Sequence, residues 1–236
     1  MHDEAINMLK EQSQKMGIEL TEEQLEKFSI YMNFLIEYNE ITNLTAIKEP
    51  NQIVIKHFLD SLLLTKTVDL NGNKKMIDIG TGAGFPGVPV KIKYPNVKLT
   101  LLDSLNKRLV FLSKLSEKIG LDYEVIHKRA EECGKDKNYR EKFDYVTSRA
   151  VASLNILAGY CLPYLKVGGI FIALKGPNAE EETVNAKNAI KEFGGKIIKT
   201  QYFELPDGSG KRSIILIEKI KKTPEMYSRV RKKIIT

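Results

Sequence analysis

Three glycines at alternate positions are the residues of this sequence that are most clearly suited to ligand binding. They are Gly80, Gly82 and Gly84, and they directly follow the short apolar run Met76–Ile79, which contains Asp78. Such a run predicts a buried strand, and glycine lets a ligand approach the backbone closely. In an open α/β sheet this loop lies at the carboxyl end of a strand, where nucleotide-like ligands bind. The pattern D-x-G-x-G-x-G differs from the G-x-G-x-x-G of dinucleotide-binding proteins.

An aspartate follows the next predicted strand. Asp103 comes directly after Leu99–Leu102 and lies 23 residues after Gly80. A carboxylate at about this distance from the first glycine binds ribose hydroxyls in dinucleotide folds. An ordinary aspartate that caps the next helix is the alternative. The glycine loop favours ribose binding, although a dehydrogenase would use the same residue.

The D-x-G-x-G-x-G pattern resembles the S-adenosylmethionine loop of Rossmann-like methyltransferases. The resemblance implies S-adenosylmethionine as cofactor, with the loop beside its amino-acid end. In such enzymes contacts to the adenine ring usually follow the third strand, where this sequence has Ala130 and Glu131. A solvated helix start, with its acidic side chains well placed on the helix dipole, explains the same residues. Spacing alone leaves both interpretations open.

The residues around the fourth predicted strand, Phe143–Ser148, disfavour several methyl acceptors. Arg149 follows the strand, in place of the Asn or Asp with two prolines that many amino-group methyltransferases have there. Cytosine C5 enzymes need a cysteine nucleophile near this strand or the next, and Cys133 and Cys161 lie in neither place. Guanine N7 suits a site without a catalytic base, because its free lone pair needs only alignment with the methyl group.

Two further side chains have an open role. Lys175 ends the fifth predicted strand, beside the expected mouth of the site, and could hold a substrate phosphate or guanine O6. A solvated lysine is the alternative. His57 lies among apolar residues in a predicted helix, which favours a packed and hydrogen-bonded histidine.

Strands and helices alternate after Gly72, which predicts a doubly wound parallel sheet. Strands are expected at Met76–Ile79, Leu99–Asp103, Tyr123–His127, Phe143–Ser148, Ile170–Lys175, Lys196–Leu205 and Ser213–Lys219. Leu165–Gly169 is expected to be a turn before the fifth strand. The last two strands flank Pro206–Gly210 and form a hairpin that makes one edge antiparallel. The fold class is α/β: a Rossmann-like class I methyltransferase with a seven-stranded, mostly parallel sheet.

The segment before this alternation has the pattern of helices. Thr21–Gln24 has the form of a capping box and opens a helix whose apolar residues recur at helical spacing. Asn39–Thr45 interrupts that pattern. A shorter helix is predicted over Ala5–Met16, and another begins after Pro50.

Charge divides the chain at about the same place. Residues 1–70 hold 6 basic and 12 acidic side chains, and residues 71–236 hold 31 and 18, so the net charge of +7 comes from the second part. This asymmetry favours a polyanion such as RNA as a partner, without identifying it. With the change of rhythm at Gly72, we expect an N-terminal helical extension over 1–72. The S-adenosylmethionine-binding methyltransferase domain then spans 73–236, with a basic C-terminal tail.

Composition is ordinary for a globular protein, with 42% hydrophobic and 28% charged residues. The sequence has no apolar stretch of about 18 residues that could span a membrane. Its two cysteines form no C-x-x-C pair, which argues against a disulfide framework and a structural zinc site. We expect a cytoplasmic protein without a metal or a membrane, and nothing requires more than a monomer.

Six motifs distributed along the chain carry a more specific resemblance. They are Tyr38–Thr45, Lys56–Ser61, Asp78–Gly87, Leu102–Ser104, Ser148–Ala150 and Leu174–Gly176. Together they resemble the bacterial small-subunit ribosomal RNA guanine-N7 methyltransferases, also called the glucose-inhibited division protein B family. The resemblance covers nearly the whole chain. It implies a helical part joined to a methyltransferase domain, and N7 methylation of a guanine in ribosomal RNA, either free or in a ribosomal particle.

The resemblance also implies which residues form the site. Those expected to hold the cofactor are Asp78, Gly80, Gly82, Gly84, Phe85, Asp103, Ser104, Ala130, Glu131 and Arg149. Arg149 and Lys175 are expected to act as the catalytic residues that position the base or a phosphate. The resemblance also associates Asn39 and His57 with the site, but it assigns neither of them a chemical role. The chain departs from the family's usual Tyr-Pro-Arg ending, because it has Tyr227-Ser228-Arg229.

Three rival functions remain at this point. A nucleotide-dependent oxidoreductase shares the fold, but the glycine spacing disfavours it. A non-catalytic RNA-binding module would keep the cofactor only for structure. A methyltransferase acting on another nucleic-acid position would keep the same loop and the same Asp103.

Overall fold

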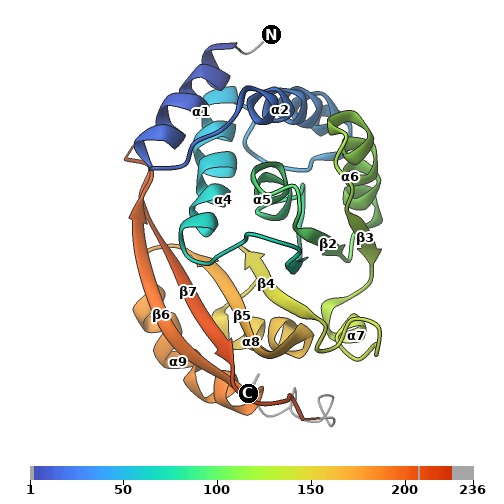
Figure 1. The fold of residues 1–236 in the computed structure, drawn as a ribbon, viewed down its shortest axis with the longest axis vertical. Coiled ribbons are helices and arrows are strands. Elements are labelled where there is room, and N and C mark those ends of the chain that lie inside the picture. Colours follow the sequence, from blue (N-terminus) through green and yellow to red (C-terminus); the bar gives the residue numbers. More distant parts are fainter. Residues whose placement is uncertain (1–2, 207, 225–236) are drawn as a thin grey trace.

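The computed structural model describes residues 3–206 and 208–224, which form a central sheet covered by helices on both faces (Figure 1). The strands are β1 Lys75–Ile79, β2 Lys98–Asp103, β3 Glu124–His127, β4 Phe143–Arg149, β5 Leu165–Lys175, β6 Gly195–Glu204 and β7 Lys211–Lys219. This three-layer arrangement confirms the expected α/β class.

The sheet has the order β3-β2-β1-β4-β5-β7-β6. Strands β1 to β5 pair in parallel, and β7 is antiparallel to both β5 and β6. The expected antiparallel hairpin is therefore present at one edge. The strand order reverses between β1 and β4, and ligands of doubly wound sheets bind at the carboxyl ends of strands beside such a switch point.

The helical segments are of two kinds, α-helices and segments of other helix types. The α-helices are α1 Asp3–Lys15, α2 Glu22–Thr42, α3 Pro50–Ile53, α4 Asp60–Leu62, α5 Gly87–Lys93, α6 Asn106–Ile119, α7 Ala130–Cys133, α8 Leu154–Cys161 and α9 Ala179–Glu192. Three segments of the described chain have other helix types: the π-helical η1 Val54–Leu59 and the 3₁₀ segments η2 Leu63–Lys66 and η3 Leu162–Tyr164.

Alternate residues of the strands face two separate cores. Met76 and Leu101 pack with helices α1 to α6, whereas Ile77 and Leu102 pack with α7, α8 and α9 on the other face. Both faces of the sheet are therefore buried, as parallel sheets require. The expected boundary at residue 72 lies between η2 and β1, and the helices before it share the first core with the sheet.

Helix α2 begins at the predicted capping box, since the Thr21 side chain and the Gln24 side chain exchange bonds with each other's backbone. The expected break from Asn39 is wrong by one turn, because the helix runs to Thr42 and Asn43 ends it in the left-handed conformation. Asn39 is buried and bonds the next loop with its side-chain amide, so this polar residue fits inside the helix. The loop that carries Thr45 is held in place by this amide.

Strand β5 begins five residues earlier than expected. Leu165–Gly169, predicted to be a turn, is already part of the strand, and Leu165 pairs with Phe143. The pairing register then shifts between Phe143 and Tyr145, and Gly168 has φ 86°. The two glycines mark an irregularity inside the strand, which is a second use of glycine in sheets.

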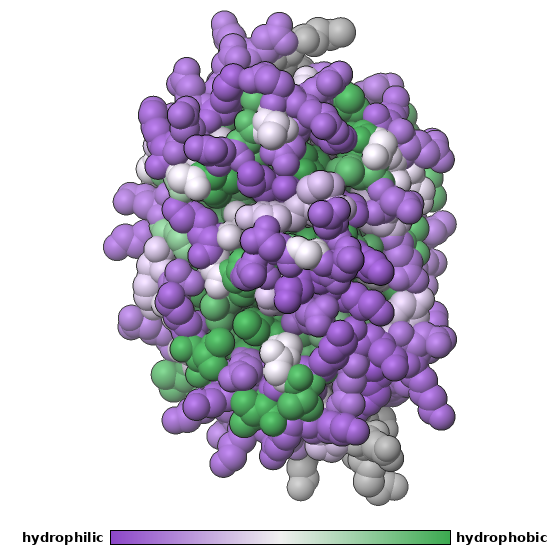
Figure 2. Space-filling model, in the orientation of Figure 1, coloured by the Kyte–Doolittle hydropathy of each residue, from purple (hydrophilic) through white to green (hydrophobic). Residues whose placement is uncertain are grey.

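The face of the molecule drawn in Figure 2 is mostly hydrophilic. Figure 2 shows hydrophobic colour gathered toward the lower part of one face, where Figure 1 places α8, α9 and β6. No helix within residues 3–206 and 208–224 is long and apolar enough to cross a membrane. The basic C-terminal tail, including Tyr227-Ser228-Arg229, lies outside the described residues.

Candidate functional site

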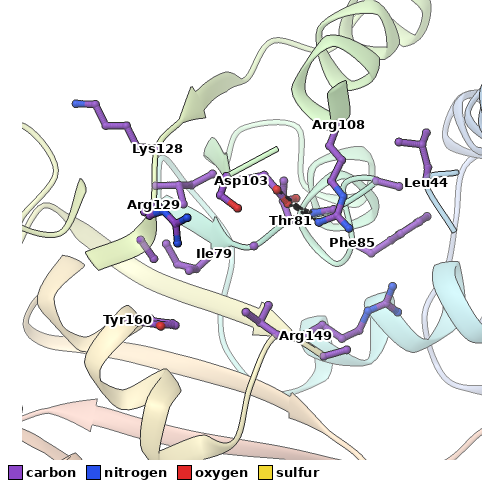
Figure 3. A pocket seen from close by; sticks show the side chains of 18 of the residues that line it. Leu44, Ile79, Thr81, Phe85, Asp103, Arg108, Lys128, Arg129, Arg149 and Tyr160 are labelled. Atoms are coloured by element: carbon purple, nitrogen blue, oxygen red, sulfur yellow. Dashed lines mark hydrogen bonds and ion pairs between the residues drawn. The ribbon is translucent and has the colours of Figure 1, made fainter. Parts of the chain in front are cut away.

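A cavity of about 490 Å³ lies at the carboxyl ends of β1, β2 and β4, beside the switch point of the sheet (Figure 3). Its lining comes from both parts of the chain: Leu44, Thr45, His57, Ile79–Ala83, Phe85, Leu102–Ser104, Arg108, Lys128–Glu131, Arg149–Val151 and Tyr160. The volume falls in the range of small-molecule and cofactor sites.

The glycine loop forms the middle of the cavity. Gly80, Gly82 and Gly84 all have positive φ values, between 61° and 104°. A Cβ atom at Gly84 would lie 2.8 Å from the Tyr31 hydroxyl oxygen, whereas a Cβ atom at Gly82 would meet nothing within 4 Å. Gly84 is therefore required for packing behind the loop, while Gly82 faces open space at the site.

Asp78 lies behind the loop and does not line the cavity. Its Oδ2 accepts hydrogen bonds from the Thr81 hydroxyl at 2.8 Å and from the Gly87 amide at 3.0 Å. Complete burial raises the pKa of this carboxyl to about 6. Its Oδ1 is buried without a hydrogen-bond partner among the described residues. Asp78 thus shapes the loop from inside the protein.

Asp103 reaches across to the same loop. Its Oδ2 accepts a hydrogen bond from the Gly82 amide at 2.9 Å, and its Oδ1 accepts one from the Leu105 amide at 2.9 Å. Arg108 forms an ion pair with Oδ2 at 3.1 Å. Arg108 Nη1 also lies 3.5 Å from Oδ1, so four contacts use the roughly four acceptor positions of the two oxygens. The 3.5 Å contact is the longest of them, and it is the one that a donor from a ligand would replace.

Arg108 is absent from the residues that the sequence predicted for the site. It lies five residues after Asp103, in the first turn of α6, so its side chain can reach back to the strand end. The sequence does contain a signal for Arg108, namely a basic residue five positions after the aspartate that is predicted to bind ribose.

Ser104, Ala130 and Glu131, which were predicted to bind the cofactor, line the cavity beyond Asp103, together with Lys128 and Arg129. The Lys128 ammonium also pairs with Asp136 at 3.0 Å. Tyr160, from α8, lines the cavity as well and was not predicted. This end of the cavity offers hydrogen-bonding groups beside the short helix α7.

At the other end, Phe85 forms a wall between two parts of the chain. The His57 ring stacks on it with centroids 4.5 Å apart, and the Arg149 guanidinium carbon lies 5.1 Å from its centroid. Tyr31 stacks on Phe85 at 5.3 Å and donates a hydrogen bond to the Ala83 carbonyl. Figure 3 shows Leu44, Phe85 and Arg149 on one side of the cavity, opposite Lys128 and Arg129.

Arg149 is held mainly by residues of the N-terminal helices. Its Nη1 donates to the Lys56 carbonyl at 3.0 Å and to Asp60 Oδ2 at 2.7 Å, and its Nη2 lies 3.2 Å from His57 Nδ1. Asp60 Oδ1 accepts a second hydrogen bond from Arg212 Nε at 3.0 Å. Two guanidinium groups therefore share one buried carboxylate.

His57 is the packed and hydrogen-bonded histidine that its sequence context favours, and it also lines the cavity. Burial, with the adjacent Arg149 charge, lowers its pKa from 6.5 to about 3. It lies in the π-helical segment η1, and π-helical turns occur frequently at functional sites. The 3.6-residue periodicity used for prediction could not detect that turn.

Lys175 is placed differently from its expected position. It does not line the cavity, and its ammonium donates to the Ala152 carbonyl at 2.6 Å and pairs with Glu182 at 2.7 Å. Its side chain is only 7% exposed. Lys175 therefore fastens the loop that follows Arg149, in which Ala150 and Val151 line the cavity.

The described residues contain no group of three or more metal-ligating side chains. Cys133 and Cys161 are both free and buried, and burial raises the pKa of each thiol. Neither therefore has the depressed thiol pKa of a reactive cysteine.

Comparison with solved structures shows the same fold in other proteins. TrmN from Thermus thermophilus has a TM-score of 0.53 and 16% identity, over 70% of this chain and 53% of that one. A chain of a fibrillarin/Nop5p complex has a TM-score of 0.54 and 15% identity, over 69% and 80% of the two chains.

Comparison of sequences is more specific. The ribosomal RNA small subunit methyltransferase G of Alkaliphilus metalliredigens is 48% identical over 223 residues, covering 94% of this chain and 93% of that protein. The protein of the same name from Clostridium botulinum is 49% identical, over 92% and 91% of the two chains. The family model described as rRNA small subunit methyltransferase G matches residues 24–209. The chain therefore belongs to this family of methyltransferases, as its motifs predicted.

Proposed function

We propose that this protein transfers the methyl group of S-adenosylmethionine to N7 of a guanine in small-subunit ribosomal RNA. The observation that carries the proposal is the composition of the cavity at the end formed by Thr45, His57 and Arg149. His57 has an acid–base side chain, but both its ring nitrogens are engaged within the protein. An acceptor that must lose a proton would need a base there, whereas guanine N7 has none to lose.

The order of the residues along the cavity matches the order of the groups in the proposed cofactor. Asp103 would accept a ribose hydroxyl in place of its long 3.5 Å contact from Arg108, and Ser104, Ala130 and Glu131 lie beyond it for the adenine ring. Gly80 and Gly82 bring bare backbone to the middle, and Phe85 and Arg149 lie at the far end. A cavity of about 490 Å³ suits a ligand of this size.

Bound S-adenosylmethionine supplies an electrophilic methyl group on a positively charged sulfur. The protein's contribution is to align the acceptor and to exclude water, which supplies much of the rate for a two-reactant transfer. Arg149 is fixed by three groups of the N-terminal helices, so it can hold an acceptor or cofactor group without moving. We propose that Lys175 acts through the Ala150–Ala152 loop, which it fastens beside Arg149.

The partner is proposed to be small-subunit ribosomal RNA, free or in a ribosomal particle, and the site of action the cytoplasm. The excess of positive charge in residues 71–236 supports attraction to RNA. A monomer is sufficient for this proposal, because the cavity is lined by residues of a single chain.

Transfer of labelled methyl from S-adenosylmethionine tests the substrate class. Purified small and large ribosomal subunits that lack the modification serve as alternative substrates. The proposal predicts label in small-subunit RNA and background label in large-subunit RNA. Cofactor binding without transfer to either RNA would instead support the rival RNA-binding module.

A further inference from the structure

Thr45 contributes a hydroxyl group to the cavity from the N-terminal helical part. It lies in the loop between α2 and α3, half-buried beside His57 and Arg149. The surrounding hydrogen bonds determine which way this hydroxyl can donate, and that direction identifies the kind of ligand atom it can bind.

The Arg149 guanidinium first fixes the tautomer of His57. A guanidinium only donates hydrogen bonds, so the His57 Nδ1 that faces Arg149 Nη2 at 3.2 Å must be the acceptor. The Lys56 carbonyl also lies 3.2 Å from Nδ1 and could accept from it, but a hydrogen on Nδ1 would then face the hydrogens of Arg149 Nη2 across 3.2 Å. The Arg149 contact therefore favours the tautomer with a bare Nδ1. Because burial keeps this ring neutral with a pKa of about 3, its one hydrogen is on Nε2.

The His57 Nε2–H then determines the role of Thr45. It donates to the Thr45 hydroxyl oxygen at 2.9 Å, and the Ile47 amide donates to the same oxygen at 3.1 Å. Both lone pairs of that oxygen are thereby used. The Thr45 backbone is also occupied, since its amide and carbonyl both bond the Asn39 side chain.

The hydroxyl hydrogen is the unused capacity of Thr45. With the hydrogen on His57 Nε2, no hydrogen bond donated by this hydroxyl occurs among the described residues, and Thr45 lines the cavity. It can therefore donate to an oxygen of a ligand and cannot accept from one.

The charges nearby favour an anionic oxygen over a neutral one. Arg149 and Arg212 share the single carboxylate of Asp60, so one positive charge of this pair has no directly bonded carboxylate. A carboxylate of a bound ligand would complete the balance.

We propose that the Thr45 hydroxyl donates a hydrogen bond to the carboxylate of S-adenosylmethionine and makes the site selective for cofactors that carry it. This inference rests on the proposed cofactor and adds a residue of the N-terminal helical part to its binding site. His57 acts as a positioning residue, because it holds the Thr45 oxygen in the donating orientation.

Calorimetric titration tests this with two ligands, S-adenosylmethionine and its decarboxylated form, and needs no RNA. Thr45→Val removes the hydroxyl with little change in shape, Thr45→Ser keeps it, and Thr42→Val is the matched control. The Thr42 hydroxyl bonds the Tyr38 carbonyl within α2 and lies outside the cavity. A hydrogen bond to a charged group predicts about a tenfold loss of S-adenosylmethionine affinity for Thr45→Val.

The expected result is that Thr45→Val loses this affinity, that Thr45→Ser and Thr42→Val keep it, and that all four proteins bind the decarboxylated ligand equally. Equal affinity of Thr45→Val and wild type for S-adenosylmethionine, or the same loss for both ligands, would overturn the inference. Failure of the wild type to bind either ligand would instead reject the proposed function. Should Thr45→Val not fold, Thr45→Ala removes the same hydroxyl without adding bulk.

Discussion

At the residue scale, a few side chains hold the site together, because the hydrogen bonds of each join two separate segments. Asp103 joins the glycine loop to the start of α6, and Arg149 joins strand β4 to the N-terminal helices. Both were predicted from the sequence. Arg108, Thr45 and Tyr160 were not. Arg108 lies only five residues after Asp103, so its spacing could have revealed it, whereas Thr45 and Tyr160 join the site only when separate segments fold together.

Asp103→Ala is expected to weaken S-adenosylmethionine binding by about tenfold or more. The substitution removes the proposed ribose acceptor and the bond to the Gly82 amide, and a hydrogen bond to a charged group contributes about 1.5–3 kcal/mol. Calorimetry provides the measurement, with Glu117→Ala on the exposed side of α6 as control. Unchanged affinity in Asp103→Ala would remove it from the cofactor site.

Lys175→Met is expected to reduce methyl transfer about tenfold while S-adenosylmethionine affinity stays within about twofold. Its ammonium fastens the Ala152 carbonyl, so its loss frees the loop after Arg149 and disturbs alignment of the acceptor. Single-turnover transfer and calorimetry give the two values. A loss confined to cofactor affinity would contradict the proposed role.

The lowered pKa of His57 should make the free energy of unfolding depend on pH. Its pKa is about 3 in the folded protein and about 6.5 in the unfolded chain, so only the unfolded chain binds this proton between those values. Stability from this residue therefore falls as the pH falls below 6.5. Asp78 acts in the opposite direction, because its raised pKa of about 6 makes its contribution fall as the pH rises from about 4 to 6.

The variant His57→Gln should lose the pH dependence that comes from His57 and keep the one that comes from Asp78. Between pH 6.5 and 5, the free energy of unfolding should fall about 1.5 kcal/mol further in the wild type than in this variant. Urea denaturation at both pH values measures the difference. Parallel pH dependence in the two proteins would show that His57 is not held neutral.

At the element scale, the glycine loop provides a matched pair of positions. Gly82→Ala adds a Cβ atom to open space at φ 61°, which costs about 1 kcal/mol in the left-handed region. Gly84→Ala adds one against Tyr31, Val88 and Leu112 at φ 104°, and overpacking adds about 1–3 kcal/mol. Thermal unfolding should rank Gly84→Ala clearly below Gly82→Ala, and equal stability would contradict the packing behind the loop.

The elements also show what the sequence could and could not predict. Apolar runs such as Met76–Ile79 give strands directly, because both faces of the sheet are buried. Leu165–Gly169 was misassigned, since its glycines serve an irregular strand and not a turn. The π-helical segment η1 has no periodicity signal of its own, so periodicity could not place His57 beside the cavity, and only the family resemblance associated this residue with the site.

At the scale of the whole molecule, the division into residues 1–72 and 73–236 describes the sequence pattern better than the packing. Phe58 and Tyr31 of the first part lie against Phe85 of the second, and one core contains residues of both. A protein with a shared core is expected to unfold in one transition. Calorimetric and van't Hoff enthalpies should therefore agree, whereas two resolved transitions would show independent domains.

The site contains residues of both parts: Thr45 and His57 belong to the N-terminal helical part, and Gly80, Asp103 and Arg149 lie at the ends of strands β1, β2 and β4. We propose that this shared site aligns guanine N7 with the methyl donor. The most direct test is nucleoside mass spectrometry of small-subunit RNA after reaction with the purified protein and labelled S-adenosylmethionine. If the site aligns N7, the label will appear in 7-methylguanosine, whereas label in any other methylated nucleoside would show that a different atom accepts the methyl group.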